Sequence, residues 1–114
     1  MRVLVIGAGR TGSRVLRQLR KNPAITVITA DPRPRLVAVE EGLIADVDIR
    51  EVLTPLTLDH ILETTRPDLV LLAISPGDMG LGQPAGVGIL TEALHEEIAA
   101  LAPVPVIDVA RAPR

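Results

Sequence analysis

The chain has 114 residues, a usual size for one domain, and a formal net charge of −2 at pH 7. Hydrophobic residues make up 47% and charged residues 23%, as expected of a soluble globular protein. Lys and Arg are spread along the chain rather than clustered, which argues against nucleic-acid binding. The absence of cysteine excludes disulfides, thiolate metal sites and a cysteine nucleophile. No Phe, Tyr or Trp is present to stack on a bound base.

The chain shows no sign of a membrane-inserted segment. Its apolar stretches are all far shorter than the roughly 20 residues that cross a bilayer. Met1-Arg2 leads directly into the first expected strand. We therefore expect no signal peptide, no direct membrane insertion and a cytoplasmic location.

The N-terminal segment joins a strand to a helix through a Gly-x-Gly-x-x-Gly motif. Residues 2–6 are nearly all apolar and predict a buried parallel strand, and residues 11–21 have the spacing of an amphipathic helix. Gly7 would allow the tight turn, Gly9 the close approach of a pyrophosphate, and Gly12 close packing of the helix. In this context the motif predicts phosphate binding at the helix N-terminus. The alternative is an ordinary turn with three incidental glycines.

The second expected strand, residues 25–30, is rich in β-branched residues and ends at Asp31. An acidic residue about 20 positions beyond the glycines is placed to accept hydrogen bonds from a ribose. A carboxylate there favours NAD, because it would repel a 2′-phosphate. Arg33 and Arg35 follow at once and could accept such a phosphate, so NADP remains an alternative. A further alternative is that Asp31 only begins an Asp-Pro turn.

The middle of the chain predicts two more helices and a weak strand. Residues 36–41 predict a short helix, and the alternation in residues 45–49 predicts a third strand. The alternative for this second segment is a metal site made by Asp46 and Asp48, but no third ligand lies nearby. A helix is then expected over residues 57–66.

Thr57 is the expected N-cap of this helix. Residues 69–74, the most apolar run, predict the fourth strand, and residues 75–88 form a long glycine-rich loop. Ligands of open α/β sheets bind beyond the carboxyl ends of the strands, where the strand order reverses. Ser75 is therefore expected to face the middle of a bound dinucleotide. The alternative is that the loop is only a connection.

A last helix over residues 89–102 and a fifth strand over residues 104–109 complete the expected elements. Their alternation predicts an α/β, three-layer Rossmann-like fold with right-handed crossovers. We expect a parallel five-stranded sheet of order 3-2-1-4-5, with helices on both faces. Residues 1–114 are expected to form a single dinucleotide-binding domain.

The motif Gly7-Ala8-Gly9-Arg10-Thr11-Gly12, together with residues 27–31, resembles the TrkA-N domains, also called RCK or KTN domains. These nucleotide-binding domains regulate potassium channels and Trk-type transporters. Residues 68–73 and 106–111 look like the fourth and fifth strands of that family. The resemblance implies that Asp31 holds the ribose and that five residues hold the pyrophosphate: Gly7, Gly9, Arg10, Thr11 and Gly12.

The resemblance also implies a function without catalysis. It predicts a regulatory or sensor domain that binds NAD(H) or an adenine nucleotide and signals to a membrane transporter or channel. The alternative is an NAD(P)-dependent oxidoreductase, or the cofactor-binding half of one, which would need an acid or base near the nicotinamide. His60 and His95 are both expected on helix surfaces, so we favour the regulatory domain. An uncovered sheet edge further predicts a homodimer.

Overall fold

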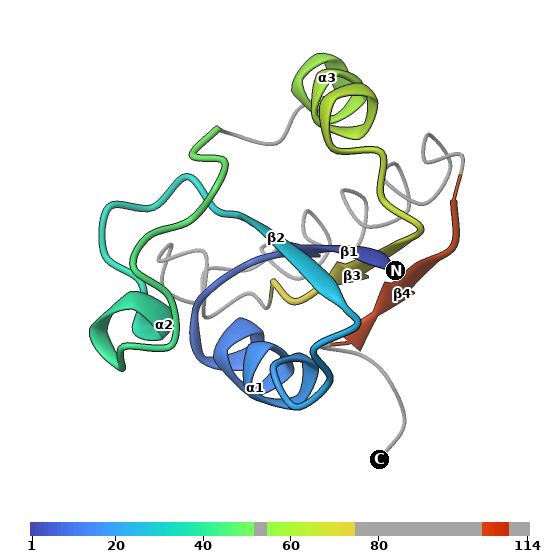
Figure 1. Ribbon diagram of the computed structural model, residues 1–114. Coiled ribbons are helices and arrows are strands. Elements are labelled where there is room, and N and C mark those ends of the chain that lie inside the picture. Colours follow the sequence, from blue (N-terminus) through green and yellow to red (C-terminus); the bar gives the residue numbers. More distant parts are fainter. Residues whose placement is uncertain (52–54, 75–103, 110–114) are drawn as a thin grey trace.

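The computed structural model describes residues 1–51, 55–74 and 104–109 (Figure 1). The predicted loop over residues 75–88, including Ser75, lies outside the described residues. So does the predicted helix over residues 89–102, with His95.

A four-stranded parallel sheet forms the centre of the described fold. Its strands lie in the order β2-β1-β3-β4. The register pairs Val3 of β1 with Val27 on one side and with Leu69 on the other. The first, second, fourth and fifth predicted strands correspond to β1, β2, β3 and β4. They lie side by side in the order predicted for them, 2-1-4-5. Their bounds are β1 Arg2–Ile6, β2 Thr26–Ala30, β3 Leu69–Leu72 and β4 Val106–Asp108.

Helices cover both faces of this sheet, which makes the fold an α/β structure with three layers (Figure 1). On one face α1, Arg10–Leu19, and α2, Val37–Glu40, pack against Val3 and Val5. On the other face α3, Pro55–Thr65, lies over the sheet. β1 is apolar along most of its length because both of its faces are covered, as is usual for central parallel strands.

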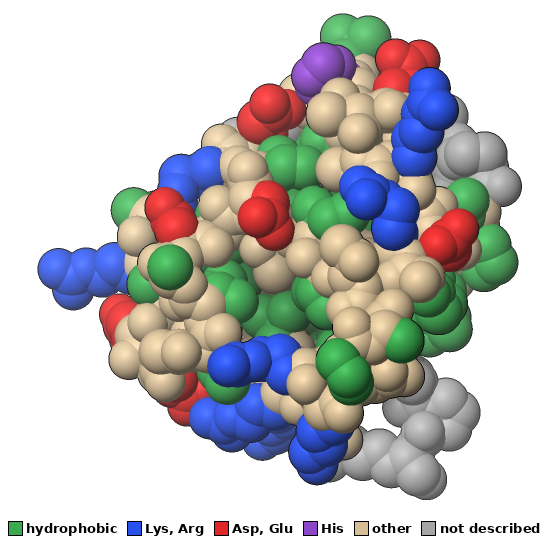
Figure 2. Space-filling view, viewed as in Figure 1, with side chains coloured by type: hydrophobic (Ala, Val, Ile, Leu, Met, Phe, Trp, Pro, Cys, Tyr) green, Lys and Arg blue, Asp and Glu red, His purple; other side chains and the backbone are tan. Residues whose placement is uncertain are grey.

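The outer surface of α1 is basic, as its pattern predicts. Val15 and Leu16 are buried, while Arg14 and Arg17 are exposed. Figure 2 shows Lys and Arg side chains gathered over this helix, along the lower edge of the view. Arg17 of this helix donates from Nη2 to both carboxylate oxygens of Glu41, each at 2.8 Å. This ion pair ties α1 to the end of α2.

The helix α3 begins two residues earlier than its sequence pattern predicts. Its first residue is Pro55, and Thr57 lies inside the helix, so the prediction of Thr57 as N-cap was wrong. Proline suits the first helical position, because its ring fixes φ near the helical value and its missing N–H has no partner there anyway. Among the described residues, no helix is long and apolar enough to cross a membrane.

The predicted third strand, residues 45–49, is reduced to one parallel bridge between Ile49 and Ala30. Ile49 N donates to the Thr29 carbonyl at 3.0 Å, and Asp31 N donates to the Ile49 carbonyl at 3.0 Å. The ladder stops there because the Thr29 N–H, which would bind the next main-chain carbonyl, donates instead to the Asp48 carboxylate at 2.8 Å. The Asp48 carboxylate thus replaces the main-chain carbonyl that would accept this hydrogen bond in a regular strand.

Candidate nucleotide-binding site

The glycine motif forms a turn at the carboxyl end of β1, between the ends of β2 and β3. Gly7 N donates to the Ala30 carbonyl at 2.8 Å, which fastens the turn to β2. On the other side Ala73 N donates to the Ile6 carbonyl at 2.8 Å. The motif therefore lies at the middle of the sheet's carboxyl edge, where nucleotides bind in open α/β sheets.

Glycine is required at two positions of this turn for reasons of space. Gly7 has φ of +110°, and a Cβ there would lie 2.6 Å from the Ala73 carbonyl oxygen. A Cβ on Gly12 would lie only 1.9 Å from the Gly7 carbonyl oxygen. The first turn of α1 thus rests directly on the backbone that leaves β1, as the motif predicts.

The N-terminus of α1 lacks the side-chain cap that most helices have. Gly9 is its N-cap, with no side-chain hydrogen bond to the first turn, and that turn holds no acidic residue. The Gly9 carbonyl accepts bonds from Ser13 N at 2.8 Å and Ser13 Oγ at 2.7 Å, which fixes its orientation. The first N–H groups of a helix have no carbonyl partner in their own helix. At this N-terminus they can donate to a bound anion, and the helix dipole favours negative charge there.

The two other predicted pyrophosphate residues lie on this first turn. Arg10 is the first residue of α1 and is exposed, and Thr11 follows it half-buried. The structure thus brings Gly7, Gly9, Arg10, Thr11 and Gly12 together around one helix end.

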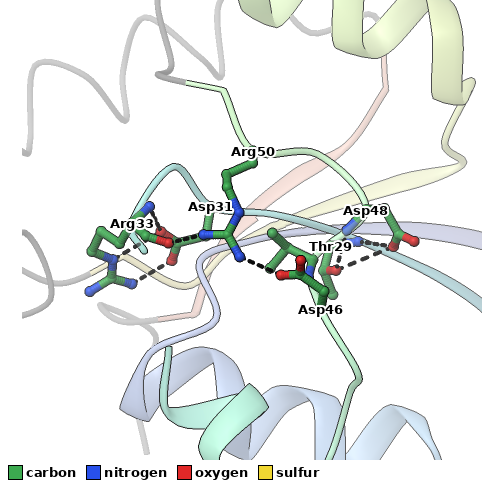
Figure 3. Close-up of polar contacts among 7 residues, drawn as sticks. Thr29, Asp31, Arg33, Asp46, Asp48 and Arg50 are labelled. Carbon is green, nitrogen blue, oxygen red and sulfur yellow. Dashed lines mark hydrogen bonds and ion pairs between the residues drawn. The ribbon is translucent and has the colours of Figure 1, made fainter. Parts of the chain in front are cut away.

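Asp31 follows β2 and is buried against the glycine turn, with only 2% of its side chain exposed. Its Oδ2 accepts a hydrogen bond from Ala8 N at 2.9 Å. Its Oδ1 accepts from Arg33 N at 3.0 Å and from Arg33 Nε at 2.9 Å, and Arg33 Nη2 lies 2.5 Å from Oδ2 (Figure 3). The carboxylate predicted to hold a ribose is therefore beside the predicted phosphate site, and in this structure Arg33 forks it.

These contacts govern the ionisation of Asp31. Burial raises the pKa of the Asp31 carboxyl, but the hydrogen bonds from the Arg33 side chain, from Ala8 N and from Arg33 N lower it, as does the Arg33 charge. The balance leaves the pKa of Asp31 below its ordinary value. The group is therefore a carboxylate at neutral pH and can only accept hydrogen bonds.

We expect Asp31 to make the stability of the domain depend on pH. The folded-state pKa of Asp31 lies below its unfolded value of about 4. The contribution of Asp31 to the free energy of unfolding is therefore complete above the unfolded value, and it is lost as the pH falls through the folded-state pKa. Asp31→Asn should thus be less stable than wild type at pH 7, and the difference should shrink below about pH 4. Urea unfolding at a series of pH values measures this.

Asp46→Asn is the control for that series. The pKa of Asp46 is also lowered, by hydrogen bonds from Val47 N and from Arg50, but its carboxylate is exposed and its contacts are screened by solvent. We expect a smaller difference from wild type at every pH. A difference between Asp31→Asn and wild type that stayed constant with pH would show that the Asp31 ion pair does not stabilise the fold.

A second polar cluster, which sequence reasoning missed, holds residues 46–50 beside Asp31 (Figure 3). Arg50 donates both to the Arg33 carbonyl and to the Asp46 carboxylate. The Asp48 carboxylate accepts hydrogen bonds from the N–H and from the hydroxyl of Thr29. The spacing of Asp46 and Arg50 by four was the only local signal. Their contact with residues 29–33 arises from the fold, since the segments are 17 to 19 positions apart.

The described residues do not form the alternative metal site of Asp46 and Asp48, and His60 belongs to α3, which lies on the opposite face of the sheet from α1. Asp46 and Asp48 bind different partners, and within the described ranges no three His, Cys, Asp or Glu residues are placed to hold a metal. His60 is exposed on α3.

Comparison with protein families matches residues 3–75 to the TrkA-N domain, which is more than half of the chain. Neither the curated proteins nor the solved structures gave a match. The matched region contains β1, the glycine turn, Asp31 and β3. The chain therefore belongs to the TrkA-N domain family, a family of Rossmann-type nucleotide-binding domains that is common in regulators of potassium transport.

Proposed function

We propose that this domain binds NAD(H) as a regulatory ligand and catalyses no reaction itself. The observation that carries the proposal is the contact between Asp31 Oδ2 and Ala8 N, 2.9 Å long. It places a buried carboxylate directly beside an uncapped helix N-terminus, so one ligand could offer a pyrophosphate to α1 and ribose hydroxyls to Asp31. TrkA-N domains bind dinucleotides of the NAD(H) type in general, which supports this choice.

Each part of the dinucleotide has a partner in this arrangement. The pyrophosphate accepts hydrogen bonds from the first turn of α1, with Arg10 and Thr11 beside it. The adenosine ribose donates to Asp31 in place of the Arg33 guanidinium. The adenine lies among aliphatic side chains, because the chain has no aromatic residue. Ser75 follows the carboxyl end of β3 in the sequence, and we propose that it faces the second ribose.

A regulatory role fits the chemistry of the described residues. A dehydrogenase needs an acid or base near the nicotinamide, or a second domain that supplies one. Asp31 is ion-paired at the ribose end of the site, and His60 is on the exposed surface of α3. We propose that the domain reports the bound nucleotide to a potassium transporter or channel, acts in the cytoplasm and forms a homodimer. β4 ends the described sheet, and this edge supports an edge-to-edge contact.

Calorimetric titration tests nucleotide binding. We expect NAD or NADH to bind, and Asp31→Ala to weaken that binding by about 1–3 kcal/mol, because the ribose loses its charged acceptor. Asp59→Ala is the control: it removes an exposed carboxylate on α3 and should leave the affinity unchanged. The titration should include NADP, ADP, ATP and S-adenosylmethionine. No binding of any of them would refute the proposal.

The oxidoreductase alternative is tested separately. The protein is incubated with NADH and a panel of carbonyl substrates, and the absorbance of NADH is followed. We expect binding of the nucleotide without its oxidation. Oxidation that depends on one of the substrates would show an enzyme.

A further inference from the structure

Arg33 occupies the acceptor that the proposed ligand needs. Its guanidinium contacts both oxygens of Asp31, with Nε 2.9 Å from Oδ1 and Nη2 2.5 Å from Oδ2. This forked geometry is the strongest form of an arginine–carboxylate pair. The Arg33 side chain is 27% exposed, so the guanidinium lies partly at the surface, while Asp31 lies beneath it.

The hydrogen bonds to Asp31 leave no place for a ribose. An ionised carboxylate has about four lone-pair sites. Two accept backbone N–H groups, from Ala8 and Arg33, and two accept the guanidinium of Arg33. The two hydroxyls of a ribose can therefore donate to Asp31 only in place of the guanidinium. The backbone donors are fixed by the turns to which they belong, whereas the Arg33 side chain can rotate.

The displaced guanidinium would remain close to the ribose. Arg50 donates to the backbone carbonyl of Arg33 and also contacts Asp46, so the main chain of Arg33 is held from the other side. A guanidinium released from Asp31 is then within reach of the 2′ position of the same ribose. A 2′-phosphate there would be repelled by Asp31 and would bind Arg33 bidentately.

We propose that Arg33 sets the nucleotide preference of this domain. It competes with the ribose hydroxyls for Asp31, which weakens the binding of NAD, and it offers a partner to a 2′-phosphate, which strengthens the binding of NADP. Asp31 alone would select NAD, and the Asp31–Arg33 pair makes the site accept both dinucleotides. This inference rests on the proposed function and adds the residue that controls its ligand.

The test is titration of wild type and Arg33→Gln with NAD and with NADP. We expect Arg33→Gln to bind NAD more tightly and NADP more weakly, so that the ratio of the two dissociation constants changes by roughly tenfold or more in favour of NAD. Arg17→Gln is the matched control, because Arg17 is also paired with a carboxylate, that of Glu41, but on the outer side of α1. There the ratio should stay within about twofold of wild type.

Each result decides the matter. An unchanged ratio in Arg33→Gln, or weaker binding of NAD, would overturn the inference while leaving the proposed function intact. An equal change in Arg17→Gln would also overturn it, because charge alone would then explain the effect. Wild type that binds neither dinucleotide would refute both. Should Arg33→Gln fail to fold, as a melting curve would show, Arg33→Lys keeps the charge without the fork and is expected to shift the ratio in the same direction.

Discussion

Gly12→Ala is expected to lose the native fold or to retain it only marginally. A Cβ at this position would lie 1.9 Å from the Gly7 carbonyl oxygen and 2.6 Å from its carbonyl carbon. Both are backbone atoms of the turn, so no side-chain rotation relieves the overlap. Alanine is normally favoured over glycine within a helix by about 1 kcal/mol, and here we expect the sign to reverse, with a loss of at least about 3 kcal/mol. Urea unfolding measures it.

Gly42→Ala provides the control for this substitution. Gly42 also has positive φ, +74°, but nothing lies within 4 Å of a Cβ built there. The expected cost is only that of the left-handed backbone, about 1 kcal/mol. If the two variants were equally stable, helix α1 would not pack on the Gly7 turn as described.

Leu4→Ala is expected to have the next largest effect on stability. Leu4 lies in the central strand β1, is fully buried and packs with Leu58 and Ile61 of α3. Truncating such a leucine removes apolar burial and leaves a cavity, which together cost about 2–5 kcal/mol. The effect should fall in the upper part of this range, because strand neighbours on both sides prevent the sheet from closing around the gap.

Leu56→Ala is the matched control. Leu56 belongs to α3, the helix against which Leu4 packs, but its side chain is 85% exposed. We expect a change within about 0.5 kcal/mol. Both variants are compared by urea unfolding under the same conditions as wild type. A loss at Leu56 as large as that at Leu4 would mean that the outer face of α3 is covered in solution.

The contacts that stabilise the fold are also those that form the site. The Gly7 turn supports α1, and the same turn places Ala8 N against Asp31. A variant that disturbs this turn should therefore lose stability and nucleotide binding together. Arg33 differs in this respect, because its side chain is partly exposed and its proposed effect is on the choice of ligand. The two kinds of variant separate folding from recognition.

Much of this architecture can be predicted from the sequence because it depends on local patterns. Continuous apolar runs indicated β1 and β3 as buried parallel strands, and glycine spacing indicated the turn before α1. The place of Asp31 at the end of β2 followed from counting along one strand–helix–strand unit. These features need only the periodicity of one element and the short connections between neighbours.

The tertiary structure decided what surrounds Asp31 and how the sheet ends. Nothing local shows that Asp48 would take the Thr29 N–H and so end the third strand at one bridge, or that Arg50 would hold the Arg33 carbonyl. These contacts join segments that are 17 to 19 positions apart in the sequence. The sequence by itself thus determined a glycine turn and an acidic residue in the right order. Only the fold decided that Arg33 forks this carboxylate, because hydrogen bonds to a side chain depend on geometry that residue spacing does not contain.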